Sequence, residues 1–268
     1  METSDYLEIN RKSWNNRVEA HLQSDFYFMD DFLKGKSSLN SIELNLLGDI
    51  QNKSLLHLQC HFGQDSLSLA RLGALVTGVD LSEKGIEAAR GLSNTLNIPV
   101  QFICSDVYNL PNHCNQEFDI VFTSYGTISW LPDLDQWASV IVQMLKPGGR
   151  FVFVEFHPVV WMFDDHFTQV GYNYFNEGPL VESESGTYAD RKADIQQTSI
   201  NWNHSISEVL SSLIRAGLEI QRIEEFDYSP YNCFFHTIEF EPGKFRIEHL
   251  GNKIPMVYSL VAKKIKES

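Results

Sequence analysis

Residues 55–80 read LLHLQCHFGQDSLSLARLGALVTGVD, and this stretch constrains the fold more than any other part of the chain. It predicts an apolar strand, a tight turn, a short helix and a second strand that ends at an acid, Asp80. In open α/β sheets, an acid at the tip of the second strand lies beside the loop that leaves the first strand and holds the two hydroxyls of a ribose. The segment therefore predicts a site for a cofactor that contains a nucleoside.

Strands and helices alternate through most of the chain, which predicts a doubly wound, mostly parallel sheet. Strands are expected at residues 55–58, 75–79, 100–104, 118–123, 151–156, 218–226 and 256–264. Helices are expected at residues 66–72, 82–96, 133–145 and 205–216, with Ser82, Asp133 and Ser205 as N-caps. The Lys-Pro-Gly-Gly turn at 146–149 should stop the third of these helices, because proline cannot continue a helix and glycine tolerates positive φ.

Two segments lie outside this alternation. Asp5-x-x-Glu8 is a capping-box pattern that predicts a helix to about Leu22, and a second helix is expected near residues 39–47. Residues 158–201 are rich in aromatic and turn residues and predict an inserted β-hairpin or lid. We therefore expect a single domain, divided into an N-terminal helical cap (1–50), a cofactor-binding core (51–158), a lid (159–201) and a C-terminal helix with the last strands (202–268).

Composition excludes several classes of partner. The formal net charge of −14 argues against a nucleic-acid partner and against an anionic membrane surface. No apolar run of ~18 residues predicts a membrane span, and the N-terminus shows no signal-peptide pattern. The four cysteines are expected to be reduced thiols of a cytoplasmic protein. The spacing of His57, Cys60 and His61 matches no common zinc pattern, so no metal site is predicted.

Several motifs resemble those of class I S-adenosylmethionine-dependent methyltransferases. They are the acid-ended second strand GVD at 78–80, Ser-Asp-Val at 105–107, FDIV at 118–121 and LKPGG at 145–149. The first loop departs from the family pattern of an acid followed by three spaced glycines, because His57 replaces the acid and only Gly63 remains. The run HLQCHFGQDSLSLA is similar to a bacterial subgroup of small-molecule methyltransferases.

The resemblance implies a fold, a cofactor and an activity. The fold would be a Rossmann-like, seven-stranded mixed sheet of order 3-2-1-4-5-7-6 with an antiparallel seventh strand. The cofactor would be S-adenosyl-L-methionine, and the reaction would be methyl transfer to a small-molecule acceptor. This chemistry mainly requires alignment of acceptor, methyl group and sulfur, so few catalytic residues are expected.

The resemblance also implies roles for single residues. Asp80 would bind the ribose and Asp106 the adenine amino group. Further cofactor-binding candidates are Gln59, Cys60, His61, Gly63, Leu81, Ser82, Val107 and Ser124. On the first helix Trp14, Arg17 and His21 share a face, and the Arg17 guanidinium suits the cofactor's carboxylate. The catalytic candidates are His157, as a general base, and Tyr125, which follows the fourth strand.

The sequence constrains the methyl acceptor and the alternative functions less closely. Aromatic residues between Trp161 and Phe175 would enclose an apolar or aromatic acceptor, or would form a homodimer contact instead. The altered first loop keeps open a non-catalytic S-adenosylmethionine-binding regulator. A nucleotide-dependent oxidoreductase fits less well, because Gln59 and His61 stand where a pyrophosphate site needs glycines.

Overall fold

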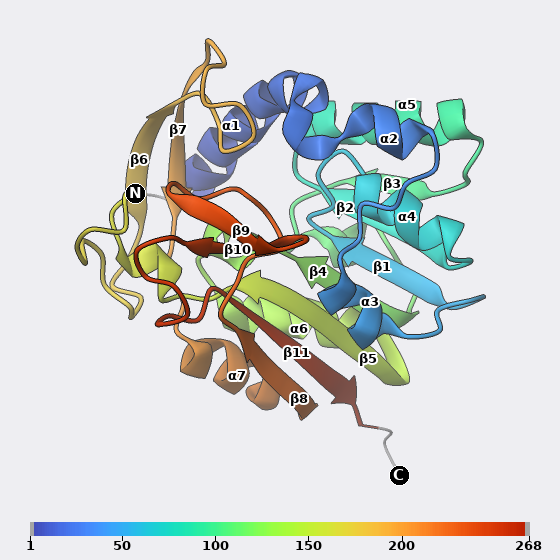
Figure 1. Ribbon diagram of the computed structural model, residues 1–268. Helices are drawn as coiled ribbons and strands as arrows, with labels where there is room; N and C mark the ends of the chain where they lie inside the picture. Colours follow the sequence, from blue (N-terminus) through green and yellow to red (C-terminus); the bar gives the residue numbers. More distant parts are fainter. Residues whose placement is uncertain (1–2, 266–268) are drawn as a thin grey trace.

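A seven-stranded sheet forms the centre of the molecule in the computed structural model, which describes residues 3–265 (Figure 1). The strand order is β3-β2-β1-β4-β5-β11-β8. Strands β1 to β5 pair in parallel, and β11 is antiparallel to both β5 and β8. The predicted sheet order and the antiparallel strand are confirmed. Their bounds are β1 Ser54–Leu58, β2 Leu75–Asp80, β3 Gln101–Cys104, β4 Phe118–Ser124, β5 Leu145–Phe156, β8 Leu218–Phe226 and β11 Val257–Lys264.

Helices cover both faces of the sheet and bury its apolar side chains. They are α3 Ser41–Leu47, α4 Gln64–Arg71, α5 Glu83–Leu96, α6 Leu134–Met144 and α7 Ile206–Arg215. Trp137 of α6 is fully buried. The centre of its ring lies 5.4 Å from that of Phe151 and 5.7 Å from that of Phe153, and both pairs meet edge-on. Leu47 of α3 belongs to a second apolar cluster, on the opposite face.

The three predicted N-caps are confirmed by hydrogen bonds. The side chain of Ser82 accepts from the Gly85 amide at 2.9 Å, and that of Asp133 accepts from the Gln136 amide at 2.9 Å. Ser205 accepts from the Glu208 amide at 3.1 Å. Each cap satisfies an N–H group that has no partner inside its helix.

Two local predictions were wrong. Helix α1 spans Thr3–Gln23, so Asp5 lies in its first turn, where a carboxylate interacts favourably with the helix dipole, instead of preceding it as a cap. Helix α6 ends at Met144, just before residues 146–149 as predicted, but β5 begins at Leu145 and not at residue 151, so these residues belong to the strand. The register with β4 shifts there, and a Cβ on Gly149 would lie 2.9 Å from the Lys146 carbonyl oxygen, so only glycine fits this bulge.

Two hairpins, one short helix and four 3-10 turns complete the described residues. The predicted inserted hairpin is present as β6 Leu180–Ser185 and β7 Gln196–Asn201. A second hairpin, β9 Thr237–Glu241 and β10 Lys244–Ile247, was not predicted. The short helix α2 covers Met29–Leu33, and single 3-10 turns occur at Asp25–Tyr27, Leu110–Asn112, Ile128–Trp130 and Val160–Met162. No helix within residues 3–265 is long and apolar enough to span a bilayer.

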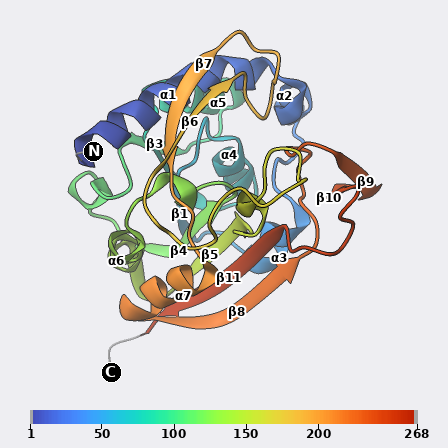
Figure 2. The same cartoon turned by 90° about the vertical axis from the view of Figure 1, so that its left-hand side faces the viewer.

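The β6–β7 hairpin lies beside α1 in both views (Figures 1 and 2). The buried side chain of Asn10 bonds Ile200 of β7 in both directions: its Nδ2 donates to the carbonyl at 2.8 Å, and its Oδ1 accepts from the amide at 2.8 Å. The Asn10 side chain therefore satisfies both backbone groups of Ile200, as a neighbouring strand would, and attaches the hairpin to α1.

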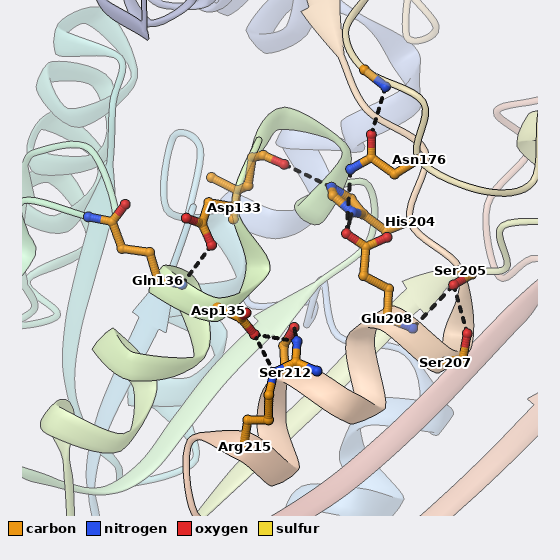
Figure 3. A network of polar contacts seen from close by, with 12 residues as sticks. Asp133, Asp135, Gln136, Asn176, His204, Ser205, Ser207, Glu208, Ser212 and Arg215 are labelled. Carbon is orange, nitrogen blue, oxygen red and sulfur yellow. Dashed lines mark hydrogen bonds and ion pairs between the residues drawn. The ribbon is translucent and has the colours of Figure 1, made fainter.

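A polar network ties the segment before α7 to the rest of the fold (Figure 3). His204 bonds the Leu131 carbonyl oxygen through Nε2 at 2.8 Å and Glu208 through Nδ1 at 3.0 Å. Arg215 donates to Asp135 of α6 at 2.5 and 3.1 Å, which links the two helices at their exposed side. Of these residues only Leu131 lines the large cavity described below.

We expect Asn10→Ala to lower the free energy of unfolding by about 2–4 kcal/mol, because it leaves a buried amide and a buried carbonyl of Ile200 without partners. Hydrogen exchange should speed up in β6 and β7 first. The exposed Asn94→Ala serves as control, and equal stability of both variants would contradict the anchoring role of Asn10.

Candidate functional site

A cavity of about 1450 Å³ opens at the carboxyl ends of the parallel strands. The residues that end or follow these strands line it: Gln59 after β1, Asp80 on β2, Ser105 after β3, Tyr125 after β4 and Phe156 on β5. Other walls come from α1, from β6 and from the segments that flank the second hairpin. Ligands of open α/β sheets bind at this edge, so the cavity is the candidate functional site.

Asp80 faces this cavity with a carboxylate that the protein already holds in place. Its Oδ2 accepts the His61 amide at 2.7 Å and its Oδ1 accepts the Ser82 amide at 2.8 Å. Burial raises the pKa of Asp80 to about 6, although these amides partly offset the effect. Each oxygen can accept a second hydrogen bond, so the group can bind a pair of ligand hydroxyls.

The loop at 59–63 turns sharply after β1 and contains one glycine. Gln59 and His61 have positive φ angles of 53° and 52°, and Gly63 has a φ of 80°. A Cβ on Gly63 would lie 2.7 Å from the Phe102 ring, so this position excludes side chains. Gln59 is held by a 2.8 Å bond from its Nε2 to the Thr127 carbonyl oxygen. Side-chain contacts therefore support left-handed residues where glycines would be expected.

Arg17 brings a buried positive charge to the cavity. Its guanidinium lies 5.0 Å from the Trp14 ring centre and 5.2 Å from that of Trp130. One terminal nitrogen lies 3.3 Å from Glu184 on β6. Burial lowers the pKa of Arg17, but arginine starts so high that the group stays charged. Its Nε has no hydrogen-bond partner among residues 3–265, which is unusual for a buried charge and suits an anionic ligand.

Two stacked imidazoles, His21 and His61, lie beside Arg17. His21 Nδ1 and His61 Nε2 are 3.0 Å apart, and the rings are nearly parallel. Burial, with a further contribution from Arg17, lowers the pKa of His21 to about 3, and burial lowers that of His61 well below its usual value. Both rings are therefore neutral near pH 7, and the positive charge at this end of the cavity comes from Arg17.

Glu155 holds the loop that carries Tyr125. Its carboxylate accepts the amides of Gly126, Thr127 at 2.7 Å, Ile128 at 3.2 Å and Phe156 at 2.7 Å, and also the Thr127 hydroxyl at 2.9 Å. The side chain is 2% exposed. Five donors around one buried carboxylate fix this loop.

Tyr125 itself has a φ of 49° and donates its hydroxyl hydrogen to Glu43 of α3 at 2.8 Å. Burial raises the pKa of Glu43 to about 7 and that of Tyr125 well above 10. The Glu43 side chain also accepts the Asn40 amide at 2.6 Å, so it closes a capping box at the start of α3. Glu43 thus connects a helix start to the cavity wall.

The structure brings most of the sequence-predicted site residues to this one cavity. Those that line it are Trp14, Arg17, Gln59, Cys60, His61, Gly63, Asp80, Leu81, Asp106, Val107, Ser124 and Tyr125. Ser82 and His157 are not among the lining residues. The Ser82 hydroxyl caps α5 and donates to Asn15 at 2.7 Å. His157 is 4% exposed, with Nε2 2.8 Å from Glu225 and Nδ1 3.2 Å from the Val159 amide.

Sequence reasoning missed three acidic residues at the cavity or its supports. Glu43 had a detectable signal, because Asn40-x-x-Glu43 is a capping-box spacing. Glu155 and Glu184 had none. Apart from the neighbouring Phe156 amide, the partners of Glu155 are 27 or more residues away in the chain, and Arg17 is 167 residues from Glu184.

Comparison with known proteins points to one class. Residues 56–153, somewhat over a third of the chain, match the family described as methyltransferase domain. The ubiquinone biosynthesis O-methyltransferase of Coxiella burnetii is 32% identical over 137 residues, covering 50% of this chain and 58% of the relative. The enzyme of that name from Saccharophagus degradans is 25% identical over 230 residues, covering 83% and 89%. The chain thus spans a little over half the length of the curated relatives first matched.

A solved structure supports the same fold. The putative S-adenosylmethionine-dependent methyltransferase from Listeria monocytogenes superposes with a TM-score of 0.58 at 18% identity, covering 84% of this chain and 98% of its own. The chain therefore has the class I methyltransferase fold, and its central segment has the sequence of a methyltransferase domain.

We expect Glu155→Gln to lower the free energy of unfolding by about 3 kcal/mol, because an amide NH₂ would face N–H donors in a closed site. Urea unfolding measures this change. Glu224→Gln, which alters an exposed ion pair, serves as control and should stay within about 0.5 kcal/mol of the wild type. A Glu155→Gln protein as stable as this control would contradict the anchoring role.

Proposed function

We propose that the protein transfers a methyl group from S-adenosyl-L-methionine to a small-molecule acceptor. The observation that carries this proposal is the Asp80 carboxylate, which the His61 and Ser82 amides hold at the cavity edge with hydrogen-bonding capacity to spare. A seven-stranded sheet of methyltransferase order surrounds it, and the family match covers residues 56–153. When bound, the cofactor supplies a methyl group activated by a positive sulfur.

The residues of the cavity fit the parts of this cofactor. Asp80 would accept the two ribose hydroxyls, and Asp106 would accept the adenine amino group. Leu81 and Val107 would contact the base, and Ser82 follows Leu81 in the chain. The loop at 59–63 and Ser124 would border the methionine part, and Arg17, beside Trp14, would bind its carboxylate. The unpartnered Nε of Arg17 and the free lone pairs of Asp80 support this assignment.

The remaining cavity wall suits an aromatic or apolar acceptor. Phe156, Trp161, Tyr231 and Phe234 line it. The rings of Phe156, Trp161 and Phe234 meet one another edge-on or tilted, and the Tyr231 ring meets that of Tyr125 edge-on. The curated relatives from Coxiella burnetii and Saccharophagus degradans are named O-methyltransferases, so we propose an acceptor with a hydroxyl group. Tyr125 is the better placed of the two catalytic candidates, because it lines the cavity and its hydroxyl bonds Glu43. The Tyr125 oxygen could take the proton of the acceptor hydroxyl while its own proton moves to the Glu43 carboxylate. His157 bonds Glu225 away from this wall.

Some finer features stay predictions from the sequence. We propose that the chain belongs to the bacterial subgroup that carries HLQCHFGQDSLSLA, and that it acts in the cytoplasm without a nucleic-acid partner or a bound metal. The homodimer and the division of one domain into cap, core and lid also stay predictions.

Binding of S-adenosylhomocysteine should weaken as Asp80 takes up a proton. The pKa of Asp80 is raised to about 6, and ribose hydroxyls bind the charged form best, so affinity should be constant from pH 7 to 8 and fall by up to roughly tenfold per pH unit below 6. Calorimetric titrations between pH 5 and 8 measure this. Asp80→Asn should bind weakly at every pH, and a wild-type affinity that does not change with pH would contradict the role of Asp80.

Tyr125→Phe should reduce turnover by roughly 100-fold without changing the affinity for S-adenosylhomocysteine more than about twofold. The assay measures S-adenosylhomocysteine release with a panel of phenols that begins with catechol. His157→Ala, tested in parallel, should retain cofactor binding and show a smaller loss of turnover, because its ring lies outside the cavity wall. If Tyr125→Phe were as active as wild type on the best phenol, Tyr125 would have no catalytic role.

A further inference from the structure

Glu184 is the residue of the β6–β7 hairpin that meets the buried Arg17. We propose that Glu184 accepts hydrogen bonds from the α-ammonium group of the cofactor while Arg17 binds its α-carboxylate. The inference rests on the proposed function and deepens it. It makes the inserted hairpin part of the cofactor site, in addition to any role as a cover for the acceptor.

In the Arg17–Glu184 pair, both the guanidinium and the carboxylate can form further hydrogen bonds. Their one close contact is 3.3 Å long, between one guanidinium nitrogen and Glu184 Oε2. A saturated pair would form two parallel bonds at shorter distances. The Nε of Arg17 has no partner in the described chain, and the Glu184 side chain is 47% exposed. A positively charged hydrogen-bond donor, Arg17, and a negatively charged hydrogen-bond acceptor, Glu184, therefore lie side by side at the cavity.

A free amino acid group carries the complementary charges on a single carbon. A guanidinium matches the carboxylate, and the ammonium then needs an acceptor close by. The neighbouring rings do not repel an ammonium, because His21 and His61 are held neutral by burial. The Trp14 and Trp130 rings flank Arg17 and shield its charge from water. A zwitterionic ligand would thus use both members of the pair.

Contacts with α1 and Tyr27 hold the hairpin, and with it the backbone of Glu184, beside Arg17. Glu184 pairs in register with Gln197 of β7, whose side chain accepts from the Ser13 hydroxyl of α1 at 3.4 Å. At the hairpin tip the Tyr188 hydroxyl lies 2.5 Å from that of Tyr27. Arg17 is on the same helix as Ser13, so both charges belong to one packed unit.

Glu182 is the other acid on this face of β6, and it is already engaged. It accepts from the Tyr172 hydroxyl at 3.1 Å and from Asn201 at 3.3 Å. Its partners leave Glu184 as the carboxylate next to Arg17. We therefore assign the ammonium contact to Glu184 and not to Glu182, although the two acids are only two residues apart.

The test compares two ligands on three proteins by titration calorimetry. S-adenosylhomocysteine carries the amino acid group, and 5′-methylthioadenosine lacks it. Glu184→Gln should bind S-adenosylhomocysteine roughly 10- to 100-fold more weakly than wild type, the loss expected for one charge-assisted hydrogen bond. Its affinity for 5′-methylthioadenosine should stay within about twofold. Glu219→Gln, an exposed acid on β8 away from the cavity, should bind both ligands as wild type does.

The other outcomes have distinct meanings. An unchanged affinity of Glu184→Gln for S-adenosylhomocysteine overturns the inference, and a tighter one shows that Glu184 competes with the cofactor for Arg17. An equal loss with both ligands also overturns it, because the substitution would then act through the fold of the hairpin. If wild-type protein bound 5′-methylthioadenosine and S-adenosylhomocysteine equally weakly or not at all, the proposed function itself would fail.

Discussion

The hydrogen bonds from the His61 and Ser82 amides to the Asp80 carboxylate organise the site. They join the end of β2 to the loop after β1 and to the start of α5, three segments that meet only at this edge of the sheet. A half-buried carboxylate needs such donors, because burial otherwise favours its protonated form. The same bonds leave its outer lone pairs facing the cavity, so one interaction both stabilises the strand ends and creates the ligand contact.

The altered first loop shows how the same backbone shape can arise without glycines. Three positions between 59 and 63 have positive φ, yet only Gly63 is sterically required to be glycine. Where the family pattern has an acid, His57 is buried, bonded to the Ser66 hydroxyl at 2.8 Å, and kept neutral by a pKa lowered to about 3. The strain of left-handed Gln59 and His61 is offset by contacts that their side chains make with other elements.

Local signals were enough to predict the strands and the helix caps, because these depend on residues close in sequence, whereas the order of the strands was implied by the family resemblance. Alternating apolar segments gave the seven strands of the sheet, and Ser82, Asp133 and Ser205 gave the helix starts. The second hairpin was missed although Pro242-Gly243 is a turn signal, since its flanking strands are short and polar. At the site, Gly63 and the acids at the strand ends could be identified from the sequence. The roles of Glu155 and Glu184 could not, because they depend on partners that only folding brings together.

A crystal structure of the complex with S-adenosylhomocysteine tests the central claim most directly, through the distances from the ribose hydroxyls to the Asp80 carboxylate. The account predicts that both hydroxyls lie within hydrogen-bond distance of Asp80, at roughly 2.5–3.0 Å, with the amide bonds from His61 and Ser82 retained. A complex in which the ligand lies outside the cavity, or in which Asp80 contacts only its own backbone neighbours, would contradict it.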